Sequence, residues 1–274
     1  MTKVKIIKHS KSAVSGKEIV TFEIEYQRFI HAEFLTHRKF SRNSASSRAI
    51  PIEKMINHVW NNPSEFVYWG KNKKGMSAGE ELTGWRLRVA KWLWKLYAKD
   101  ACIKAWILSK VTGAHKQNVN RILEPYQNIK VVVTATDWNN FFALRDHKDA
   151  QPEIKYLAHM MRIALDNSDP QLLQIGEWHI PYVDSKEGTE DNLKMSASLC
   201  AQVSYRTAND SQATADKIYQ QLVVSRPVHA SPTEHQAQVL NGLESGNFMG
   251  KFSGNFDWSF LQWRQTIPHN TVHG

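Results

Sequence analysis

The most regular alternation of apolar and polar side chains lies at residues 18–26, EIVTFEIEY. Apolar side chains occupy every second position, at Val20, Phe22, Ile24 and Tyr26, and polar side chains lie between them. A period of two is that of a β-strand with one face in the core and the other facing solvent. We therefore predict a half-buried strand in this segment.

The longest helical pattern covers residues 79–111. Large apolar side chains recur there at steps of three and four, and basic side chains lie largely between them. The apolar positions are Leu82, Trp85, Val89, Trp92, Leu93, Leu96, Ile103, Trp106 and Ile107, and the basic ones are Arg86, Arg88, Lys91, Lys95 and Lys99. We predict a packed helix with a solvated basic face. A helix lying on a membrane surface would show a similar pattern and is the alternative.

Prolines mark several further helix limits. Pro51 and Pro63 bracket a short helix, Pro125 closes another, and Pro152 begins an amphipathic helix at 152–165. The other predicted elements are helices at 27–38, 192–205 and 213–224, a buried strand or helix start at 130–138, and a loop at 241–256. Together these segments indicate an α+β protein with more helix than strand.

The composition is that of a soluble globular protein, since 42% of the 274 residues are hydrophobic and 22% are charged. No apolar run approaches the roughly 20 residues that cross a bilayer, and the first residues, MTKVKIIKHS, lack the core of a signal peptide. We expect a cytoplasmic protein without membrane contact. Cys102 and Cys200 cannot make a disulfide framework or a usual zinc site, so we interpret each as a small buried apolar residue.

The chain is basic, with a net charge of +9 and an isoelectric point near 9.4. This charge favours an anionic partner, either nucleic acid or a small phosphate ester. Residues 34–51, FLTHRKFSRNSASSRAIP, are rich in basic side chains and serine and contain no acidic residue. Arg38 and Arg48 have planar forks that match phosphate oxygens, and the serines add hydroxyl and backbone donors. The segment is a candidate anion site, and a solvated basic loop is the plain alternative.

The same segment resembles the signature of the flavin-dependent thymidylate synthases. That signature reads roughly Arg-His-Arg, two residues, Ser, one residue, Asn, two residues, Ser, one residue, Arg. Here it stands as Thr36-His37-Arg38-Lys39-Phe40-Ser41-Arg42-Asn43-Ser44-Ala45-Ser46-Ser47-Arg48.

Three other segments add to the resemblance. Residues 139–155, NNFFALRDHKDAQPEIK, are similar to the family's Asn-Phe, Leu-Arg and Ala-Gln-x-Glu-Ile-Arg segment. Residues 229–235, HASPTEH, are similar to its His-x-Thr-Pro-x-Glu-His segment, and CAQVSY at 200–205 resembles its Ala-Arg-Val-Ser stretch. In the family these last two segments precede the signature, whereas here they follow it. The resemblance therefore implies a circularly permuted chain.

The resemblance also implies the fold, and the polar composition of residues 182–194 indicates a linker that divides the chain. We expect the helix-rich α+β fold of the family, with an antiparallel or mixed sheet. Residues 1–181 are expected to form the catalytic core, residues 182–194 a polar linker, and residues 195–274 the permuted segment that completes the flavin site, followed by a C-terminal extension. These parts are expected to form one integrated domain.

By this resemblance, FAD is contacted by residues of the signature and by residues of the segments at 139–155 and 229–235. His37 and Arg38 match contacts in the signature, and Arg145 matches a contact in the second segment. Ser231 takes the place of a flavin-contacting Thr. The expected cofactor-binding residues are His37, Arg38, Asn43, Asn140, Leu144, Arg145, His229, Ser231 and Glu234. Without the family, Arg145 would be interpreted as an ordinary ion-pair residue and His37 as a surface histidine.

Several of the expected nucleotide-binding positions carry a different residue from the one in the family. Lys155 replaces an Arg beside the pyrimidine, which keeps the charge but loses the bidentate fork. Thr36 replaces the first Arg of the signature, Ser44 replaces a Glu, and Glu33 lies where the family has a Gln. The expected substrate-binding residues are Glu33, Thr36, Ser44, Ser46, Ser47, Arg48 and Lys155, of which Arg48 and Lys155 are also the expected catalytic residues. Asn128 or Lys130 is expected to stand in for a phosphate-binding Arg.

The resemblance implies transfer of a one-carbon unit from methylenetetrahydrofolate to C5 of dUMP, with reduced FAD as reductant and NADPH recharging the flavin. It also implies a homotetramer. Two alternatives are open. The altered nucleotide positions suit a relative that acts on another pyrimidine nucleotide, such as dCMP, or that delivers a hydroxymethyl group. The basic, tryptophan-rich composition suits a nucleic-acid-binding protein.

Overall fold

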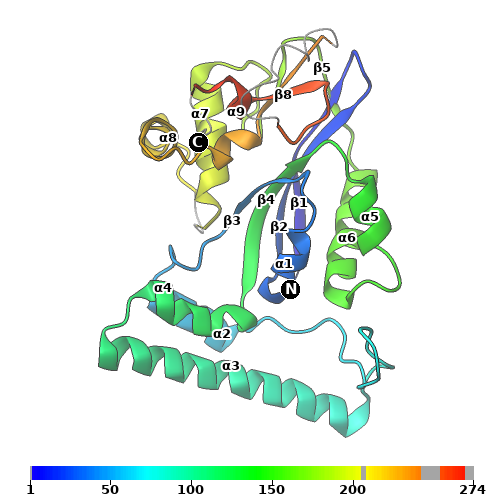
Figure 1. Cartoon of the computed structure of the whole chain (residues 1–274), viewed down its shortest axis with the longest axis vertical. Helices are drawn as coiled ribbons and strands as arrows, with labels where there is room; N and C mark the ends of the chain where they lie inside the picture. Colours follow the sequence, from blue (N-terminus) through cyan, green and yellow to red (C-terminus); the bar gives the residue numbers. More distant parts are fainter. Residues whose placement is uncertain (1, 205–207, 242–253, 269–274) are drawn as a thin grey trace.

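The computed structural model describes residues 2–204, 208–241 and 254–268, which are organised around a mixed five-stranded sheet (Figure 1). The strand order is β3-β4-β2-β1-β5, and each neighbouring pair is antiparallel except β1 and β5. The strands are β1 (Lys3–Ser12), β2 (Glu18–Gln27), β3 (Ser41–Ser44), β4 (Asn128–Ala135) and β5 (Gln171–Leu173). The expected α+β fold with a mixed sheet is confirmed.

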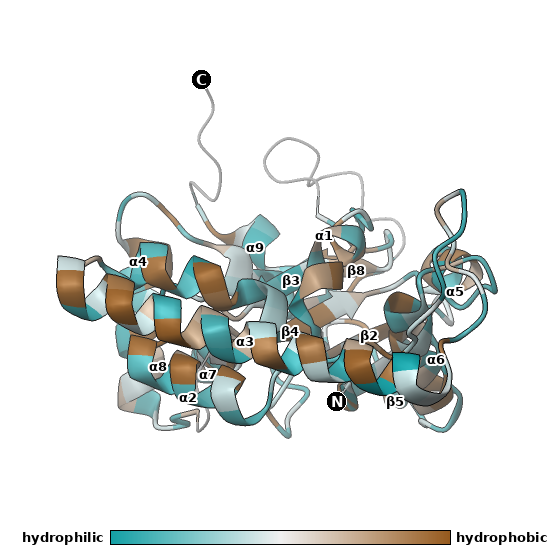
Figure 2. Ribbon diagram, turned by 90° about the horizontal axis from the view of Figure 1, so that it is seen from below, coloured by the Kyte–Doolittle hydropathy of each residue, from teal (hydrophilic) through white to brown (hydrophobic). Residues whose placement is uncertain are grey.

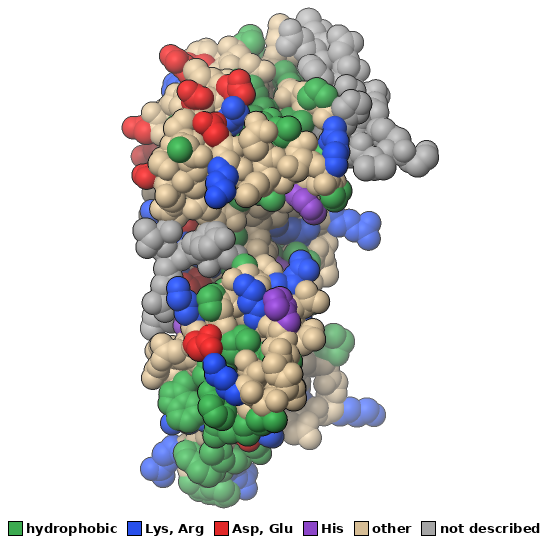
Figure 3. Space-filling view, turned by 90° about the vertical axis from the view of Figure 1, so that its left-hand side faces the viewer, with side chains coloured by type: hydrophobic (Ala, Val, Ile, Leu, Met, Phe, Trp, Pro, Cys, Tyr) green, Lys and Arg blue, Asp and Glu red, His purple; other side chains and the backbone are tan. Residues whose placement is uncertain are grey.

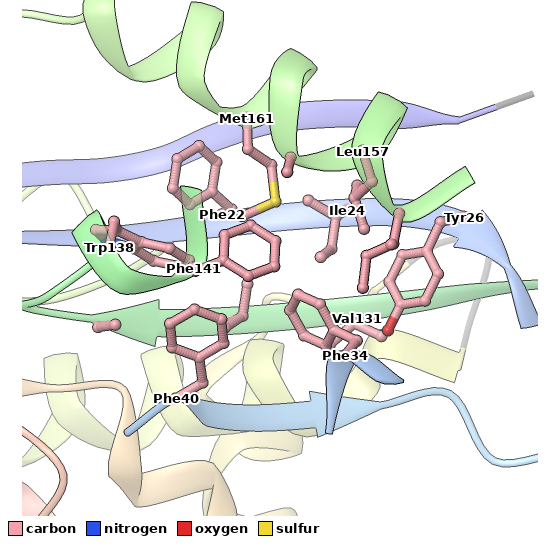
Figure 4. Close-up of a cluster of buried hydrophobic side chains, with 14 of the residues drawn as sticks. Phe22, Ile24, Tyr26, Phe34, Phe40, Val131, Trp138, Phe141, Leu157 and Met161 are labelled. Carbon is pink, nitrogen blue, oxygen red and sulfur yellow. The ribbon is translucent and has the colours of Figure 1, made fainter. Parts of the chain in front are cut away.

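One face of the sheet carries the main hydrophobic core (Figure 4). Phe22, Ile24 and Tyr26 of β2 point into it, and Leu157 and Met161 reach it from a helix above. The covering elements are η1 (Arg28–Ile30), α1 (His31–Phe34), α5 (Asn139–Arg145) and α6 (Pro152–Asp166). The alternation in the sequence of β2 therefore places the predicted apolar side chains in the core.

The opposite face packs against the C-terminal part of the chain. Its elements are a three-stranded antiparallel sheet, β6 (Trp178–His179), β7 (Ala237–Val239) and β8 (Phe260–Gln262), with α7 (Glu190–Ala201), η3 (Gln202–Ser204), α8 (Gln212–Tyr219), η4 (Gln220–Val224), η5 (Ser231–Glu234) and α9 (Trp263–Thr266).

A line of buried hydrogen bonds joins the two layers. Thr21 Oγ1 of β2 lies 2.8 Å from His179 Nε2 and 2.7 Å from Thr134 Oγ1, and Thr134 Oγ1 lies 2.8 Å from His235 Nδ1. All four side chains are buried. The strand predicted as half-buried is therefore covered on both faces at this point, because its polar side chains have polar partners in the second layer.

A helical layer lies across one end of the sheet, at the bottom of Figure 1. It consists of α2 (Ile52–Asn61), α3 (Gly84–Thr112), α4 (Lys116–Val119) and η2 (Asn120–Tyr126). A small core of its own joins Met55 and Val59 of α2 to Ala98 and Cys102 of α3 and to Leu123.

Several sequence predictions are confirmed by this arrangement. The helix bracketed by two prolines is α2, the helix begun by Pro152 is α6, and the segment at 130–138 contains most of β4. Cys102 and Cys200 are free and buried. In the described part of the chain, no helix has the length and apolar character needed to span a membrane.

Other predictions need correction. The helix predicted at 27–38 ends at Phe34, because the chain turns there toward β3. Strand β1 was not predicted, because the alternation of Lys3, Val4, Lys5 and Ile6 is short and breaks at Ile7, where the pairing with β2 shifts register. Helix α7 begins at Glu190, so the end of the polar segment 182–194 is helical. Most of the loop predicted at 241–256 lies outside the described residues.

The largest correction concerns α3, which does form but buries a different face from the one predicted. Its buried residues are the small side chains Ala98, Ala101, Cys102 and Ala105. Seven of the nine large apolar side chains predicted to be packed are exposed, with Trp85 at 64%, Trp92 at 61% and Trp106 at 52%, while Leu82 and Leu93 are half-buried.

Candidate functional site

Arg145 is the centre of a compact polar cluster between α1 and α5. Its guanidinium donates from Nε to His37 Nε2 at 3.1 Å, from Nη1 to Glu33 Oε2 at 3.4 Å and from Nη2 to Thr36 Oγ1 at 3.2 Å. Four residues that the sequence comparison divided between flavin and nucleotide sites thus lie together. Because a guanidinium has five N–H donors, these three bonds leave donors that an incoming anion can use.

His37 in this cluster is a neutral hydrogen-bond acceptor. Its ring stacks on Phe40, with centroids 5.6 Å apart, and meets the edge of Phe141 at 4.9 Å. Burial, followed by the nearby charges of Arg145 and Arg42, lowers the pKa of His37 to about 4. Near pH 7 the ring is therefore uncharged. Its Nε2 carries no proton and accepts the hydrogen bond from Arg145 Nε.

Arg42 has a structural role, although it belongs to the basic segment of the signature. Its Nη1 donates to the carbonyl oxygens of Phe34 at 3.4 Å, Leu35 at 3.0 Å and His37 at 3.2 Å. These carbonyls lie at the end of α1 and in the turn that follows it, where those of Phe34 and His37 also accept backbone N–H groups. Arg42 therefore holds the turn that presents His37 and is engaged by the protein itself.

Asn43 joins the signature strand β3 to the distant segment 229–235. In the amide orientation that satisfies its neighbours, Nδ2 donates to the carbonyl oxygens of Ser231 at 3.2 Å and Arg42 at 3.0 Å. The same amide lies 3.3 Å from Nε2 of His235, which is 192 residues away in the sequence. The structure therefore brings together two segments that the sequence assigned to one flavin site. Ser231 and His229 are exposed there.

Glu234 in this second cluster is buried and forms an ion pair with Arg264 Nη1. Burial raises the pKa of Glu234, although Arg264 and Arg42 oppose that shift. Sequence reasoning gave no role to Arg264, because no motif marks it.

The C-terminal strand β8 ties β3 to η5. Gln262 Nε2 donates to Ser41 Oγ and to the carbonyl oxygen of Glu234, both at 2.7 Å. Asn255 Nδ2 donates to the same Ser41 hydroxyl at 3.1 Å. Gln262 is fully buried, and the sign of this role in the sequence is an amide among the apolar residues of FLQW.

The turn after β3 holds the expected phosphate-binding residues. Ser47 is buried, its hydroxyl donates to Glu124 Oε1 at 2.8 Å, and its carbonyl oxygen accepts from Asn120 Nδ2 at 2.7 Å. Arg48 follows directly and is exposed, while Ser44 and Ser46 are half-buried. Glu124 and Asn120 thus hold the turn from the protein interior, and the guanidinium of Arg48 lies on the surface.

Lys155 lies in the first turn of α6 and is half-buried. Its neighbour Glu153 is buried and accepts from the backbone N–H of Val67 at 2.8 Å and from Gln151 Nε2 at 3.1 Å. The Gln-x-Glu part of this segment therefore anchors a loop. Neither Lys155 nor Arg48 hydrogen-bonds to the Arg145 cluster.

The remaining expected residues lie on the surface near these groups or are already paired. Arg38, Asn140 and Leu144 are exposed. Lys130, expected to replace a phosphate-binding Arg, forms an ion pair with Glu23 at 2.9 Å. Asn128 has a buried Oδ1 without a hydrogen-bond partner among the described residues.

The fold and these clusters define an α+β protein with basic polar groups gathered around the β3 edge of its sheet. A family model described as thymidylate synthase complementing protein matches residues 4–171, which is more than half of the chain. The chain belongs to this family. The match includes the signature and the segment at 139–155, but not the segment at 229–235.

Solved structures similar to the chain include two with named ligands. A UMP/dUMP methylase, PolB from Streptomyces cacaoi bound with 5-Br UMP, has 14% identity and a TM-score of 0.48, covering 60% of this chain and 88% of that one. Thymidylate Synthase X from Helicobacter pylori with FAD and dUMP has 14% identity and a TM-score of 0.36, covering 54% and 67%. No curated protein matches the chain in sequence.

Proposed function

We propose that the chain transfers a one-carbon unit from methylenetetrahydrofolate to C5 of dUMP and reduces it to a methyl group. In the balanced reaction, NADPH and a proton are consumed, and thymidylate, tetrahydrofolate and NADP⁺ are formed. Family membership supports this proposal. The observation that carries it is the gathering of Glu33, Thr36, His37 and Arg145 into one cluster.

The cluster is suited to hold the anionic part of a flavin nucleotide. Arg145 is positioned by three partners, and its side chain keeps 22% of its surface exposed. Because His37 is neutral, it positions the guanidinium without adding a repelling charge. Arg38 lies exposed next to His37 and can add a second cation. FAD, when bound, would supply the redox chemistry.

Arg48 and Lys155 are proposed to act on the nucleotide. The planar fork of Arg48 suits a phosphate, and the ammonium of Lys155 suits the negative charge that develops on the pyrimidine. Within the described chain neither residue hydrogen-bonds to the Arg145 cluster. A homotetramer in which a complete site takes residues from more than one copy is consistent with this.

The second candidate is an enzyme that uses the same flavin and folate on another pyrimidine nucleotide, such as dCMP, or delivers a hydroxymethyl group. Thr36 favours this candidate, because it replaces the first Arg of the family signature and its hydroxyl already accepts a hydrogen bond from Arg145. Lys155 favours it as well, since an ammonium cannot make the bidentate contact of a guanidinium.

The visible absorption spectrum of the purified protein, after addition of FAD and dialysis, tests the flavin part of the proposal. We expect a retained yellow chromophore. A colourless protein that cannot retain FAD would contradict the proposal, and salt-dependent binding to single-stranded DNA in the same sample would favour a nucleic-acid-binding protein.

A further inference from the structure

An unbroken chain of hydrogen bonds between side chains crosses the molecule from β1 to β3. Each member of the chain comes from a different segment and lies within hydrogen-bond distance of the next one. In spatial order they are Ser10, His179, Thr21, Thr134, His235 and Asn43, with successive distances of 2.9, 2.8, 2.7, 2.8 and 3.3 Å. All but Asn43 are fully buried, at 0% exposure. Their polar atoms therefore depend on one another for hydrogen bonds.

The number of hydrogens couples the two histidines of this chain. A hydroxyl has one hydrogen to donate, and a neutral imidazole has one N–H. Both rings are neutral near pH 7, because burial lowers the pKa of His235 to about 3 and that of His179 well below its usual value. Every link then has a donor and an acceptor only if all the hydrogens point in the same direction along the chain. His179 and His235 must therefore carry their hydrogen on the same ring nitrogen, both on Nδ1 or both on Nε2.

The amide of Asn43 selects one of these two arrangements. In the orientation that satisfies its neighbours, Nδ2 donates to the carbonyl oxygens of Ser231 and Arg42, and this nitrogen is the amide atom that faces His235 Nε2. An amide nitrogen accepts no hydrogen bond, so a hydrogen on Nε2 would point at another donor. His235 therefore carries its hydrogen on Nδ1. By the coupling along the chain, His179 also carries its hydrogen on Nδ1.

The chain ends at the edge of the sheet where the proposed flavin segments meet. Asn43 lies on the edge strand β3, and its bond to the carbonyl of Ser231 holds η5 beside that strand. Seen from below, β3, β8 and α9 lie on one side of the molecule, where Gln262 bonds to Ser41 (Figure 2). On the face that carries this edge, basic and histidine side chains gather at the middle, and hydrophobic ones gather at the lower end (Figure 3). The buried chain thus connects the interior of the protein to a basic part of its surface.

Resting on the proposed function for the identity of the ligand, we propose that His235 is a positioning residue for FAD and that the buried chain sets its tautomer. With no hydrogen on Nε2, His235 lets the Asn43 amide turn its nitrogen toward Ser231 and hold the segment 229–235 against β3. Because His235 is fully buried, it acts on the cofactor through Asn43 and not by direct contact.

The Thr21→Val variant tests the chain at a residue that lies two links away from His235. In the wild type the Thr134 hydroxyl donates to Thr21 Oγ1. In the variant this acceptor is gone, so the hydroxyl turns to Nδ1 of His235, and the ring hydrogen moves to Nε2, toward the Asn43 amide. Thr21→Ser keeps the hydroxyl and should behave as the wild type does. The matched control is Thr2→Val, which removes another buried threonine hydroxyl that lies outside the chain.

The first readout is the tautomer, taken from nitrogen NMR spectra of the full chain with isotope-labelled histidine. Spectra of the His179→Gln and His235→Gln variants assign the resonances of the two rings. We expect the hydrogen on Nδ1 of both rings in the wild type, and on Nε2 of His235 in Thr21→Val. Different tautomers for the two wild-type rings, or a His235 ring that is unchanged in Thr21→Val, would overturn the proposal.

The second readout is the affinity for FAD, measured by fluorescence quenching. Because the moved hydrogen breaks about one hydrogen bond of the site, we expect Thr21→Val to bind FAD about fivefold more weakly than the wild type. Thr21→Ser and the control should stay within about twofold of the wild type. A Thr21→Val variant that is less stable to denaturant but binds FAD as the control does would show that the chain has only a structural role.

Failure of the proposed function gives a different result. If the wild type does not bind FAD, hydrogen exchange of the backbone in the segment 229–235, measured by mass spectrometry, takes the place of the affinity. Faster exchange there in Thr21→Val than in the control supports the positioning of this segment by His235, and equal exchange overturns it.

Discussion

Arg145 connects α5 to three residues of the signature through its guanidinium. In the Arg145→Ala variant we expect the affinity for FAD to fall by at least tenfold, because the positioned cation is lost. Fluorescence quenching on FAD addition measures this affinity. The matched control is Arg162→Ala, which removes an ion pair with the neighbouring Asp146. Equal FAD affinity in the Arg145 variant and the wild type would rule out the assigned flavin contact.

Arg48 separates nucleotide binding from flavin binding. Its side chain is exposed, so Arg48→Ala should leave the free energy of unfolding nearly unchanged. We expect dUMP affinity to fall by tenfold or more and FAD affinity to change less than twofold, as measured by calorimetry. The surface substitution Arg121→Ala, in the nearby η2, serves as the control. An unchanged dUMP affinity would show that the phosphate binds elsewhere.

The buried histidines predict how stability depends on pH. Burial lowers the pKa of His235 to about 3 and that of His179 well below its usual value. Because the unfolded chain binds these protons near pH 6.5 and the folded chain does not, stability is full above pH 6.5 and falls as the pH decreases toward 3. The expected slope is about 1.4 kcal/mol per pH unit for each histidine, measured by denaturant unfolding between pH 7 and 5. A stability that does not change in this range would contradict the burial of neutral rings.

At this scale the motifs predicted one of the contacts between site residues and missed others. His37 and Arg145 were found from motif spacing, and the structure joins them directly. The role of Arg42 could not be predicted, since its acceptors are backbone carbonyls that only the turn after α1 exposes. The partner of Glu234 was missed because Arg264 belongs to no motif and reaches it only through the fold.

At the scale of elements, β8 and α9 hold the candidate site together. Gln262 is buried and bonds to Ser41 and to the backbone of Glu234. In a Gln262→Leu variant the buried carbonyl of Glu234 loses this donor and Ser41 keeps only Asn255, so we expect the free energy of unfolding to fall by about 1–3 kcal/mol. We also expect weaker FAD binding, because β3 and η5 lose their common partner.

Chemical denaturation and FAD titration of this variant check both expectations. The control is Gln238→Leu, since Gln238 lies on neighbouring β7 and bonds only to the carbonyl of Gly176 at the surface. If the Gln262 variant unfolds and binds FAD as the control does, β8 has no part in forming the site.

Element prediction succeeded where the side-chain pattern reflects packing within one chain. The alternation of β2 and the Pro-bounded helices α2 and α6 are of this kind. It failed for β1, whose alternation is short and breaks at Ile7, and for the packed face of α3. The large apolar side chains of α3 were predicted to pack, but small residues make its contacts and most of the large ones are exposed. The periodicity alone does not show which side of a helix the chain covers.

For the whole molecule, the circular permutation and the domain division are still predictions. The segment at 229–235 contacts β3 through Asn43 and His235, as a flavin site shared by these segments requires. This contact does not depend on the order of segments along the chain. The homotetramer is likewise a proposal.

The measurement that tests the proposed function most directly is the mass of the product. The protein loaded with FAD is incubated without oxygen with dUMP, methylenetetrahydrofolate and NADPH, and the nucleotide is identified by mass spectrometry, with dCMP in a parallel reaction. We predict that thymidylate forms from dUMP. A hydroxymethylated nucleotide, or turnover of dCMP alone, would establish the second candidate. If both nucleotides are unchanged although FAD is bound and reduced, one-carbon transfer by this chain is contradicted.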